Sequence, residues 1–485
     1  MEHHNQDIMV VEIMDKARAA WHHFSNLDQE QTDRIVRAVY AAGFSNRKRL
    51  AEMAFEETGI GNVHDKTIKN IIATRFVYRD IRDQKTVGII SEDPVSGLVE
   101  IAKPLGPVFA VTPITNPTST VLFKILIAMK TRNPLVIYPH GAARKCSIEA
   151  ARVCYEAAVG AGAPENCIQW VGKASRDQVL GFMGNHYTAM VMATGSVSLV
   201  KAAYSSGNPA IGVGPGNVPV YIGKSADVHF AVDQILLSKL FDNGTICASE
   251  QAVIISKYNA KEVESVFREK GAYFLSPEEA EKVGKIAINQ HTRSMNAEII
   301  GKPATFIAEL ARIKVPSGTR ILIAKMDPFQ VGFKHPLSLE ILAPILAFYV
   351  VENFEDGIAM CKKVNELGGL GHTVSIFSND DAKIRYFAQS LNAGRIVVNT
   401  PSSQGALGSL YNSLVPSMVL ACGSGGKNFT TDNISTKHLL NIQRIAYRKL
   451  NFCAEHQLGE AFCCDEKLTI DEIDRLCNEK RPVLK

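Results

Sequence analysis

The pattern of apolar positions along the chain changes near residue 108. Before it, the region from about 7 to 58 carries apolar side chains at helical spacing, as in Val11, Ile13 and Met14, which predicts helices. After it, short apolar runs typical of buried strands alternate with longer stretches typical of helices. This alternation predicts a parallel sheet with helices on both faces, the doubly wound, nucleotide-binding type of α/β domain.

The predicted strands fall into two α/β units. A second unit is expected to start near Asp227, with a helix that leads to Cys247. A separate segment at 98–102 alternates apolar and polar side chains, which predicts an exposed strand. The first unit takes strands at 108–111, 135–138, 167–171, 189–192 and 218–222 and helices at 119–131 and 142–161, and the second takes strands at 251–255, 321–323, 374–377 and 397–399.

Composition sets few limits on function. A chain of 485 residues is too long to fold around a single hydrophobic core, and it is long enough for two or three packed units. No run reaches the roughly 18 uncharged apolar residues of a membrane-spanning helix, and the N-terminus lacks a signal pattern. We therefore expect a cytoplasmic protein without a membrane partner. A net charge of +4 suits small anionic molecules but gives no footprint for nucleic acid.

One of the ten cysteines stands apart. Without a C-x-x-C pair, the set predicts reduced thiols and no metal site, and the pair Cys463-Cys464 is interpreted as a feature of the tail. Cys247 lies in a short polar turn, 241–250, between an apolar helical pattern and an apolar strand. A thiol at the mouth of such a turn is open to a substrate, whereas most free cysteines are buried. Cys247 is therefore the candidate nucleophile.

Asn116 is a candidate partner for that chemistry. A thiolate that attacks an aldehyde creates an oxyanion, which needs hydrogen-bond donors already in place. Asn116 lies in the loop 112–119 between a buried strand and a helix, and ligands bind at the carboxyl ends of strands in such sheets. The alternative is that Asn116 only caps the helix or forms a turn before Pro117, and the loop taken alone favours this alternative.

Other residues after predicted strands are candidates for dinucleotide binding. Gly195 and Ser196 offer backbone amides to a phosphate at a helix start, although a tight turn fits them equally. The segment 212–216 only imitates a phosphate loop, because Pro215 breaks a helix start. His140, His372 and Glu340 are also candidates, and a structural role explains each of them as well.

Several segments in one order along the chain resemble the aldehyde dehydrogenase superfamily, in particular its coenzyme A-acylating branch. The resemblance covers nearly the whole chain and extends to the aldehyde dehydrogenase half of bifunctional aldehyde/alcohol dehydrogenases. It also extends to stand-alone acylating succinate-semialdehyde and sulfoacetaldehyde dehydrogenases. The matching segments are 115–120 (TNPTST), 201–207 (KAAYSSG), 212–217 (GVGPGN), 242–251 (DNGTICASEQ), 371–373 (GHT) and 422–424 (CGS).

The resemblance implies an aldehyde dehydrogenase-like fold with two doubly wound α/β domains and a small β oligomerisation arm. It also implies NAD or NADP as cofactor, coenzyme A as co-substrate, a short-chain aldehyde as substrate, and a homodimer or homotetramer. The implied division is a dinucleotide-binding domain at 1–97 and 108–226, a catalytic domain at 227–400, the arm and return segment at 98–107 and 401–450, and a tail at 451–485.

The same resemblance implies roles for single residues. Cys247 is the implied nucleophile, and Asn116 with the backbone amide of Cys247 is the implied oxyanion hole. Glu340 matches the residue that holds the nicotinamide ribose, and His372 lies in a segment near the active site, with its role left open. The residues implied to line the dinucleotide are Thr112, Pro113, Ile114, Thr115, His140, Gly195, Ser196, Gly214 and Gly423.

One residue that hydrolytic relatives carry is absent. Their segment E-L-G-G-K supplies a glutamate that activates water, whereas residues 212–217 here contain no carboxylate. Losing a positioned general base slows water attack roughly 10²–10⁴-fold. A thiol with a pKa of about 8.5 still attacks at neutral pH. Thiolysis by coenzyme A is therefore expected to outrun hydrolysis, and a hydrolytic aldehyde dehydrogenase is the less favoured alternative.

Two departures from the branch leave the substrate and the cofactor open. Gly425 stands where relatives usually have tryptophan, with Lys427 nearby, so packing on the substrate or cofactor side should differ. Arg144 and Lys145 fit either the 2′-phosphate of NADP or exposed helix charges. Acetaldehyde and sulfoacetaldehyde are expected about equally, ahead of succinate semialdehyde. A non-enzymatic scaffold, and cargo of a protein-shelled compartment suggested by 468–476, are further alternatives.

Overall fold

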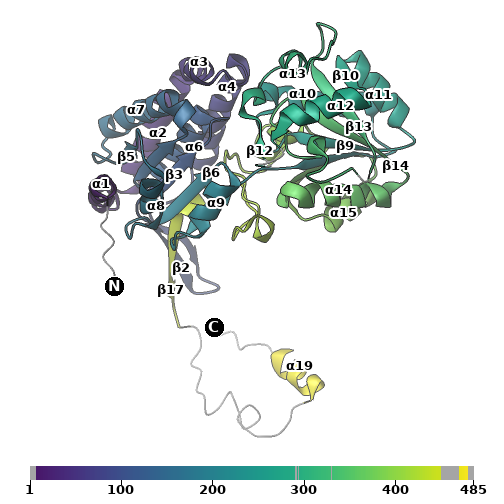
Figure 1. The fold of residues 1–485 in the computed structure, drawn as a ribbon. Coiled ribbons are helices and arrows are strands. Elements are labelled where there is room, and N and C mark those ends of the chain that lie inside the picture. Colours follow the sequence, from purple (N-terminus) through teal and green to yellow (C-terminus); the bar gives the residue numbers. More distant parts are fainter. Residues whose placement is uncertain (1–6, 290–291, 293, 329, 449–468, 479–485) are drawn as a thin grey trace. The chain divides into compact units, whose positions relative to one another are not determined.

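The computed structural model describes residues 7–289, 292, 294–328, 330–448 and 469–478. The chain divides into two units: Met1–Thr86 with Pro104–Leu440, and Val87–Lys103 with Asn441–Lys485. The larger unit holds a five-stranded and a seven-stranded sheet of parallel strands, both flanked by helices (Figure 1). The predicted α/β class is confirmed.

The five-stranded sheet has the order β5-β4-β3-β6-β7. All five residues of its central strand β3 are buried, as expected where helices cover both faces. From β3 the chain moves outward through β4 to β5 and then restarts on the other side at β6, so the strand order reverses between β3 and β6. Ligands bind at such a reversal, outside the carboxyl ends of the strands. The strands are β3 (Val108–Thr112), β4 (Leu135–Pro139), β5 (Ile168–Trp170), β6 (Met190–Thr194) and β7 (Ala210–Val213).

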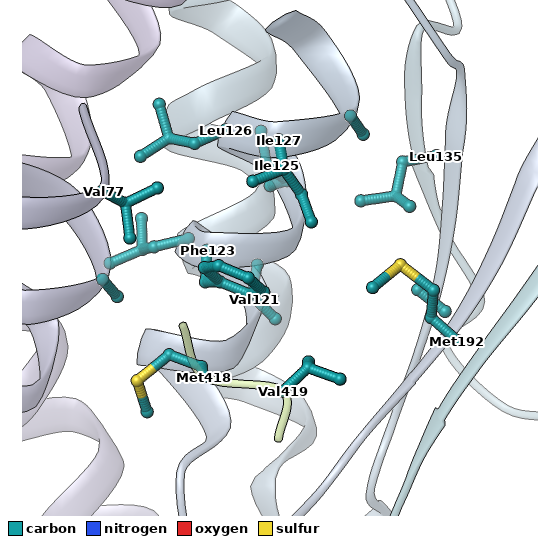
Figure 2. Packing of buried hydrophobic residues seen from close by; sticks show 14 of the residues in the cluster. Val77, Val121, Phe123, Ile125, Leu126, Ile127, Leu135, Met192, Met418 and Val419 are labelled. Atoms are coloured by element: carbon teal, nitrogen blue, oxygen red, sulfur yellow. The ribbon is translucent and has the colours of Figure 1, made fainter. Parts of the chain in front are cut away.

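Helix α6 (Pro117–Lys130) belongs to the part of the larger unit that holds the five-stranded sheet, and it is buried along its whole length. Figure 2 shows its apolar side chains packed in one cluster with Val77, Leu135 and Met192. Each fully buried side chain of this size stabilises the fold by about 1.5–3 kcal/mol. The other helices are α1 (Ile8–Phe24), α2 (Gln29–Ser45), α3 (Arg47–Thr58), α4 (Val63–Ile71), α5 (Val77–Ile81), α7 (Arg144–Gly160), α8 (Arg176–Gly184) and α9 (Val197–Tyr204).

The seven-stranded sheet has the order β10-β13-β14-β9-β8-β15-β16. Its strands are β8 (Val218–Ile222), β9 (Glu250–Ser256), β10 (Ala272–Leu275), β13 (Ile321–Met326), β14 (Ile345–Val351), β15 (Gly371–Phe377) and β16 (Ala393–Val398). Its main helices are α10 (Val228–Leu240), α11 (Ala260–Glu269), α12 (Pro277–Ala287), α13 (Ala304–Leu310), α14 (Phe354–Gly368), α15 (Asp381–Ser390) and α16 (Ser402–Leu407).

One predicted strand lies in a different sheet from the one expected. The segment at 218–222 was assigned to the first α/β unit, but β8 pairs with β9 and β15 in the seven-stranded sheet. The local sequence of a fully buried apolar strand does not indicate which sheet it joins. Its pairing with strands far away in the sequence determines the sheet. The strands expected at 251–255, 321–323, 374–377 and 397–399 all lie in the seven-stranded sheet, although β16 ends at Val398.

The smaller unit contains a three-stranded sheet of order β1-β2-β17. Strand β2 (Leu98–Pro104) confirms the exposed strand predicted at 98–102, and β17 is Leu440–Ala446. Strand β1 (Gly88–Asp93) pairs antiparallel with β2, although its residues were expected in the dinucleotide-binding domain. Residues 401–440, expected with the arm, belong to the larger unit.

The tail is described only in part. Helix α19 (Ile470–Asn478) covers much of the amphipathic stretch noted at 468–476, whereas Leu468 and the Cys463-Cys464 pair lie outside the described residues. Among the helices that the structure describes, none is long and apolar enough to cross a membrane.

Candidate active site

Cys247 lies in the turn that links α10 to β9. The turn contains two consecutive residues with left-handed backbone, Asp242 and Asn243 (φ 48° and 52°). Such conformations cost roughly 1–3 kcal/mol each and persist only where the surroundings enforce them. Here the carboxylate of Asp65 accepts the N–H of Asp242 (2.7 Å), and the amide of Asn243 donates to the carbonyl of Gly301 (2.9 Å). The turn therefore has a fixed shape before any substrate arrives.

The thiol of Cys247 is more open than those of the other cysteines. Cys247 is half-buried, whereas the remaining cysteines with described side chains are all buried (Cys146, Cys154, Cys167, Cys361 and Cys422). The residue is thus less buried than those five, and access of a substrate to its sulfur stays a prediction.

His372, at the start of β15, contacts this thiol. Its Nε2 lies 3.2 Å from Sγ of Cys247. Burial raises the pKa of the Cys247 thiol to about 12, with Glu340 and Cys422 adding to the rise and Arg395 opposing it. Burial also lowers the pKa of His372 to about 3, and the charge of Arg395 acts in the same direction. At neutral pH the pair therefore consists of an uncharged thiol and an uncharged imidazole.

A buried ionic cluster lies under the turn. The carboxylate of Asp242 accepts hydrogen bonds from Lys66 (3.0 Å) and Lys69 (2.5 Å), and all three side chains are almost fully buried. Lys69 also donates to Thr245 (2.8 Å). Although burial opposes ionisation, the two lysines lower the pKa of Asp242, while burial lowers the pKa of Lys69 to about 8. Two lysines thus share the carboxylate of Asp242, and the nearby carboxylate of Asp65 also acts to raise the pKa of Lys69.

The same cluster fixes Asn116. Lys69 donates to Oδ1 of Asn116 (2.7 Å), and Nδ2 donates to Thr115 (3.2 Å). Because an ammonium can only donate, the atom that it contacts must be the amide oxygen. Asn116 stands at the N-cap position of α6 without a side-chain capping bond, so its side chain does not cap this helix, whereas the alternative of a turn before Pro117 is not contradicted. The amide is instead oriented with its N–H₂ group turned away from Lys69.

The residues implied to line the dinucleotide follow adjacent strands. Thr112 ends β3 and precedes the loop 113–115, and Gly195 with Ser196 follows β6, so the two groups flank the reversal of strand order. Gly214 follows β7, and a Cβ atom there would meet nothing within 4 Å. An open backbone at the carboxyl edge of the sheet fits a bound dinucleotide.

His140, Ser196 and Gly423 also make local structural bonds. His140 accepts the N–H of Ala142 through Nδ1 (3.2 Å), and Ser196 caps α9. Gly423 has φ +56°, and its N–H donates to the carbonyl of Thr430 (2.8 Å). Their contact with a dinucleotide stays a prediction.

Glu340 lies beside the segment 212–217. Its Oε1 accepts the N–H of Gly216 (2.8 Å), and burial raises its pKa to about 7 despite that bond and the charge of Lys239. The sequence places no carboxylate in this segment, but the fold brings Glu340 against it. If water attacked the thioester in this protein, Glu340 would be the candidate general base.

Gly216 is required for close packing around the thiol. A Cβ atom there would lie 2.4 Å from the carbonyl oxygen of Cys247 and 3.2 Å from the ring of His372. We expect Gly216→Ala to displace the turn and lower kcat/KM by about 10²-fold, since misplacement of about 1 Å costs that much. Steady-state kinetics test this, with Gly318→Ala as control, because a Cβ atom at Gly318 meets nothing within 4 Å. Equal kinetics for both variants would contradict the expectation.

The sequence did not mark Lys66, Lys69 or Asp242 as functional. Lys66 and Lys69 are three residues apart on α4 and read as ordinary solvent-facing charges of a helix. A signal existed in Asp242, which stands in the same polar turn as Cys247, but nothing local shows that its partners lie about 175 residues away.

With this geometry in view, the comparisons with known proteins assign the family. The model of the aldehyde dehydrogenase family matches residues 3–299, and the chain belongs to that family. Its relatives point more narrowly to acylating members. An Entamoeba histolytica aldehyde-alcohol dehydrogenase 2 is 45% identical over 87% of this chain and 49% of its own length. A Clostridium kluyveri succinate-semialdehyde dehydrogenase (acetylating) is 37% identical over 91% of this chain and 96% of its own.

Solved structures agree with this placement. An acetylating aldehyde dehydrogenase from Geobacillus thermoglucosidasius superposes with a TM-score of 0.88 at 45% identity, over 92% of this chain and 97% of the other. A Rhodopseudomonas palustris propionaldehyde dehydrogenase, 25% identical with a TM-score of 0.81 over 90% and 97% of the two chains, was solved with bound CoA and an acylated cysteine. The chain spans about half the length of the aldehyde-alcohol dehydrogenases that it matches. The predicted resemblance and fold are confirmed.

Proposed function

We propose that this chain is a coenzyme A-acylating aldehyde dehydrogenase that converts a short-chain aldehyde into acyl-CoA through Cys247. The observation that carries the proposal is the convergence of three features at one edge of the sheets. The thiol of Cys247 contacts His372, and an amide held by Lys69 lies in the loop after β3. The open backbone at Gly214 follows a neighbouring strand. A nucleophile, an oxyanion donor and a dinucleotide edge are the parts that this reaction needs.

The chain's residues divide the work as follows. The sulfur of Cys247 attacks the aldehyde carbon, and the new oxyanion is held by the amide of Asn116 and the backbone N–H of Cys247. Lys69 fixes the orientation of that amide before the substrate arrives. The dinucleotide, held along residues 112–115, Gly195 and Gly214, would supply the two-electron acceptor for the hydride that this carbon loses. Cys247 then carries a thioester, which coenzyme A cleaves to give the acyl-CoA.

Coenzyme A rather than water is the proposed acceptor. Residues 212–217 carry no carboxylate, and Glu340, which the fold brings there, accepts a backbone N–H through Oε1. The relative solved with bound CoA and an acylated cysteine shows that the fold accommodates both groups.

An uncharged aldehyde such as acetaldehyde is the proposed substrate, ahead of sulfoacetaldehyde. Arg395 is the cation that acts on the pKa of Cys247, and it already donates to Thr431, Asn433 and Ala421. A sulfonate needs a cation or several free donors, and Arg395 offers none that the protein does not already use. Gly425, where relatives carry tryptophan, packs against Leu370, and the nearby Lys427 is solvent-exposed.

NAD is the proposed cofactor in preference to NADP. The carboxylate of Glu57 accepts the backbone N–H groups of Lys145 (2.8 Å) and Cys146 (2.7 Å) in the first turn of α7. An anion therefore already occupies the amides that would otherwise attract a 2′-phosphate at this end of β4. Lys145 itself is exposed, in keeping with an ordinary helix charge.

Product analysis with and without coenzyme A tests the function. With acetaldehyde and NAD, we expect acetyl-CoA in the complete mixture and a rate roughly 10²–10⁴-fold lower without coenzyme A. NADH absorbance gives the rate and mass spectrometry the product. Free acetate formed at the full rate without coenzyme A would establish a hydrolytic enzyme with Glu340 as the candidate base. Faster turnover with sulfoacetaldehyde would overturn only the choice of acetaldehyde, and faster turnover with NADP only the choice of NAD. No turnover with any aldehyde would favour a non-enzymatic scaffold.

The assembly and the location are part of the same proposal. We propose a cytoplasmic homodimer or homotetramer, with the three-stranded sheet of the smaller unit as the oligomerisation arm. Light scattering during size-exclusion chromatography measures the assembly, and a monomer would contradict it. The alternative of compartment cargo is tested by deleting 468–485 and following the location in cells.

A further inference from the structure

Arg395, in β16, is a buried cation close to the candidate active site. It is 2% exposed, and every acceptor that the described residues give it is uncharged. A guanidinium has five N–H groups and can only donate, so its contacts fix which atoms around it are acceptors. Nη2 donates to the carbonyls of His372 and Ala421 (2.7 Å each), Nη1 to the carbonyl of Thr431 (3.1 Å) and Oδ1 of Asn433 (3.3 Å), and Nε to Oγ1 of Thr373 (3.3 Å).

The hydroxyl of Thr373 connects Arg395 to His372. Its oxygen accepts from Nε of Arg395 and lies 2.9 Å from Nδ1 of His372. Thr373 is fully buried, and within the described part of the chain Nδ1 is the only acceptor that its hydroxyl hydrogen reaches. Since a buried hydroxyl leaves its hydrogen unpaired only at a cost, this hydrogen points to Nδ1. Nδ1 therefore carries no hydrogen of its own.

A neutral imidazole holds one hydrogen, which must then be on Nε2, 3.2 Å from the sulfur of Cys247. We infer that Arg395 and Thr373 are positioning residues that hold His372 in its Nε2–H tautomer, so that His372 donates a hydrogen bond to the sulfur of Cys247 and does not take its proton. This inference rests on the proposed function, in which Cys247 is the nucleophile.

A doubly protonated ring is disfavoured at this place. Its second hydrogen on Nδ1 would turn toward the oxygen of Thr373, whose own hydrogen would then lose its acceptor. It would also put two cations side by side, because the carbonyl of His372 already receives the guanidinium of Arg395. The low pKa of His372 agrees with this arrangement. The other titratable groups that act on Cys247 are Glu340 and Cys422. Asp432 is the carboxylate that acts on Arg395, and among the described residues the two form no ion pair.

The tautomer of His372 determines where the proton of Cys247 goes and which atom His372 donates to in each step. The thiol of Cys247 loses its proton to solvent base, and the thiolate is held by Nε2–H and by the field of Arg395. The S–C bond forms while the carbonyl π pair moves to oxygen. The thioester requires that this pair re-form the C=O bond as the carbon loses a hydride, for which NAD would be the two-electron acceptor. When coenzyme A, as its thiolate, attacks the thioester, the C–S bond to Cys247 breaks and the departing sulfur regains the hydrogen bond from Nε2. His372 thus acts as a donor to the nucleophile and to the leaving group.

The tautomer can be observed directly. Magic-angle-spinning NMR of enzyme labelled with ¹⁵N-histidine, with the His372 signals identified by their loss in His372→Asn, should place the hydrogen on Nε2. The rate of iodoacetamide alkylation at Cys247, followed by peptide mass spectrometry, should rise steadily from about pH 6 to about pH 9, without an inflection. A hydrogen on Nδ1, or a plateau with an inflection near about pH 6.5, would overturn the inference.

Two variants of Thr373 test the positioning role. Thr373→Val removes the hydroxyl at nearly constant shape and should slow alkylation at fixed pH roughly tenfold, because a hydrogen bond to a charged sulfur is lost. Thr373→Ser keeps the hydroxyl and should stay within about twofold of the parent. The Kd for NAD should be unchanged in both. Equal alkylation of the valine and serine variants would overturn the inference.

The same samples separate this inference from the proposed function. If enzyme alkylated at Cys247 keeps its coenzyme A-dependent activity, Cys247 is not the nucleophile and the proposed function fails whatever the tautomer. If alkylation abolishes activity while Nδ1 carries the hydrogen, only the inference about His372 fails.

Discussion

Cys247→Ala is expected to lose coenzyme A-dependent aldehyde oxidation by on the order of 10⁴-fold or more, with dinucleotide binding intact. Without the sulfur no covalent intermediate forms, and the loss of a nucleophile removes a whole catalytic pathway rather than one interaction. The change should leave the fold alone, because Cys247 is less buried than the other cysteines with described side chains. Initial rates of NADH formation with acetaldehyde and coenzyme A measure the loss, and fluorescence titration with NAD measures binding.

Cys154→Ala is the matched control for that experiment. Cys154 is buried in the core on α7, and burial raises the pKa of its thiol to about 12 without any contact to the site. We expect it to retain activity within a few-fold. If Cys247→Ala kept the activity of the parent, the sulfur would have no catalytic role.

Asp242→Asn is expected to destabilise the protein by about 3–5 kcal/mol and to lower activity as well. The change removes the carboxylate that Lys66 and Lys69 share, and leaving buried charges without a partner has a cost of that size. Lys69 should then deprotonate or move, which releases the amide of Asn116. Thermal unfolding followed by circular dichroism measures the first effect, and kcat with acetaldehyde measures the second.

The pH dependence gives a further check on Asp242. Its pKa is lowered in the folded state, since the attraction of Lys69 and Lys66 outweighs the opposing effect of burial. Its stabilisation is therefore fully present above the unfolded pKa of about 3.9 and is lost as the pH falls through the lower folded value. The difference in stability between parent and variant should hold at neutral pH and shrink below about pH 4. A difference that grows on acidification would contradict this account.

Asp233→Asn serves as the control for the ionic cluster. Asp233 pairs with Lys270 at the surface with half of its side chain exposed, and such pairs contribute about 0–1 kcal/mol. The variant should unfold within a few degrees of the parent. If it lost as much stability as Asp242→Asn, burial would not explain the effect at Asp242.

Local sequence predicts those parts of this protein that local forces determine. Continuous apolar runs such as Val108–Thr112 are buried strands, and the polar turn around Cys247 carries the most open described thiol. The chain at 218–222 was predicted as a strand but in the wrong sheet, because its partners β9 and β15 are chosen by the global packing. For the same reason 88–93 was not marked as the hairpin partner of 98–104.

The site shows the same limit. Cys247 and Asn116 could be chosen because their residue types fit the chemistry and their loops follow or precede strands. The contact of His372 with the thiol joins residues 125 positions apart, and that of Lys69 with Asn116 joins residues 47 apart. Lys69, Asp242, Arg395 and Thr373 all owe their importance to burial, which turns ordinary polar residues into fixed donors and acceptors. The periodicity of apolar residues along the chain does not predict such long-range side-chain contacts.

The left-handed pair Asp242 and Asn243 links catalysis to folding in one stretch of chain. The carboxylate of Asp242 accepts hydrogen bonds from both lysines and from the backbone of Asn62, while its own backbone holds the unusual bend that presents Cys247. An engineer who wants a wider pocket therefore has little freedom in this bend, since a change that relaxes its shape also takes away the carboxylate that Lys66 and Lys69 share. Packing limits the loop around Gly425 in another way, because a Cβ atom at Gly425 would lie 2.9 Å from the side chain of Leu370 and one at Gly426 would lie 2.4 Å from Cβ of Cys422.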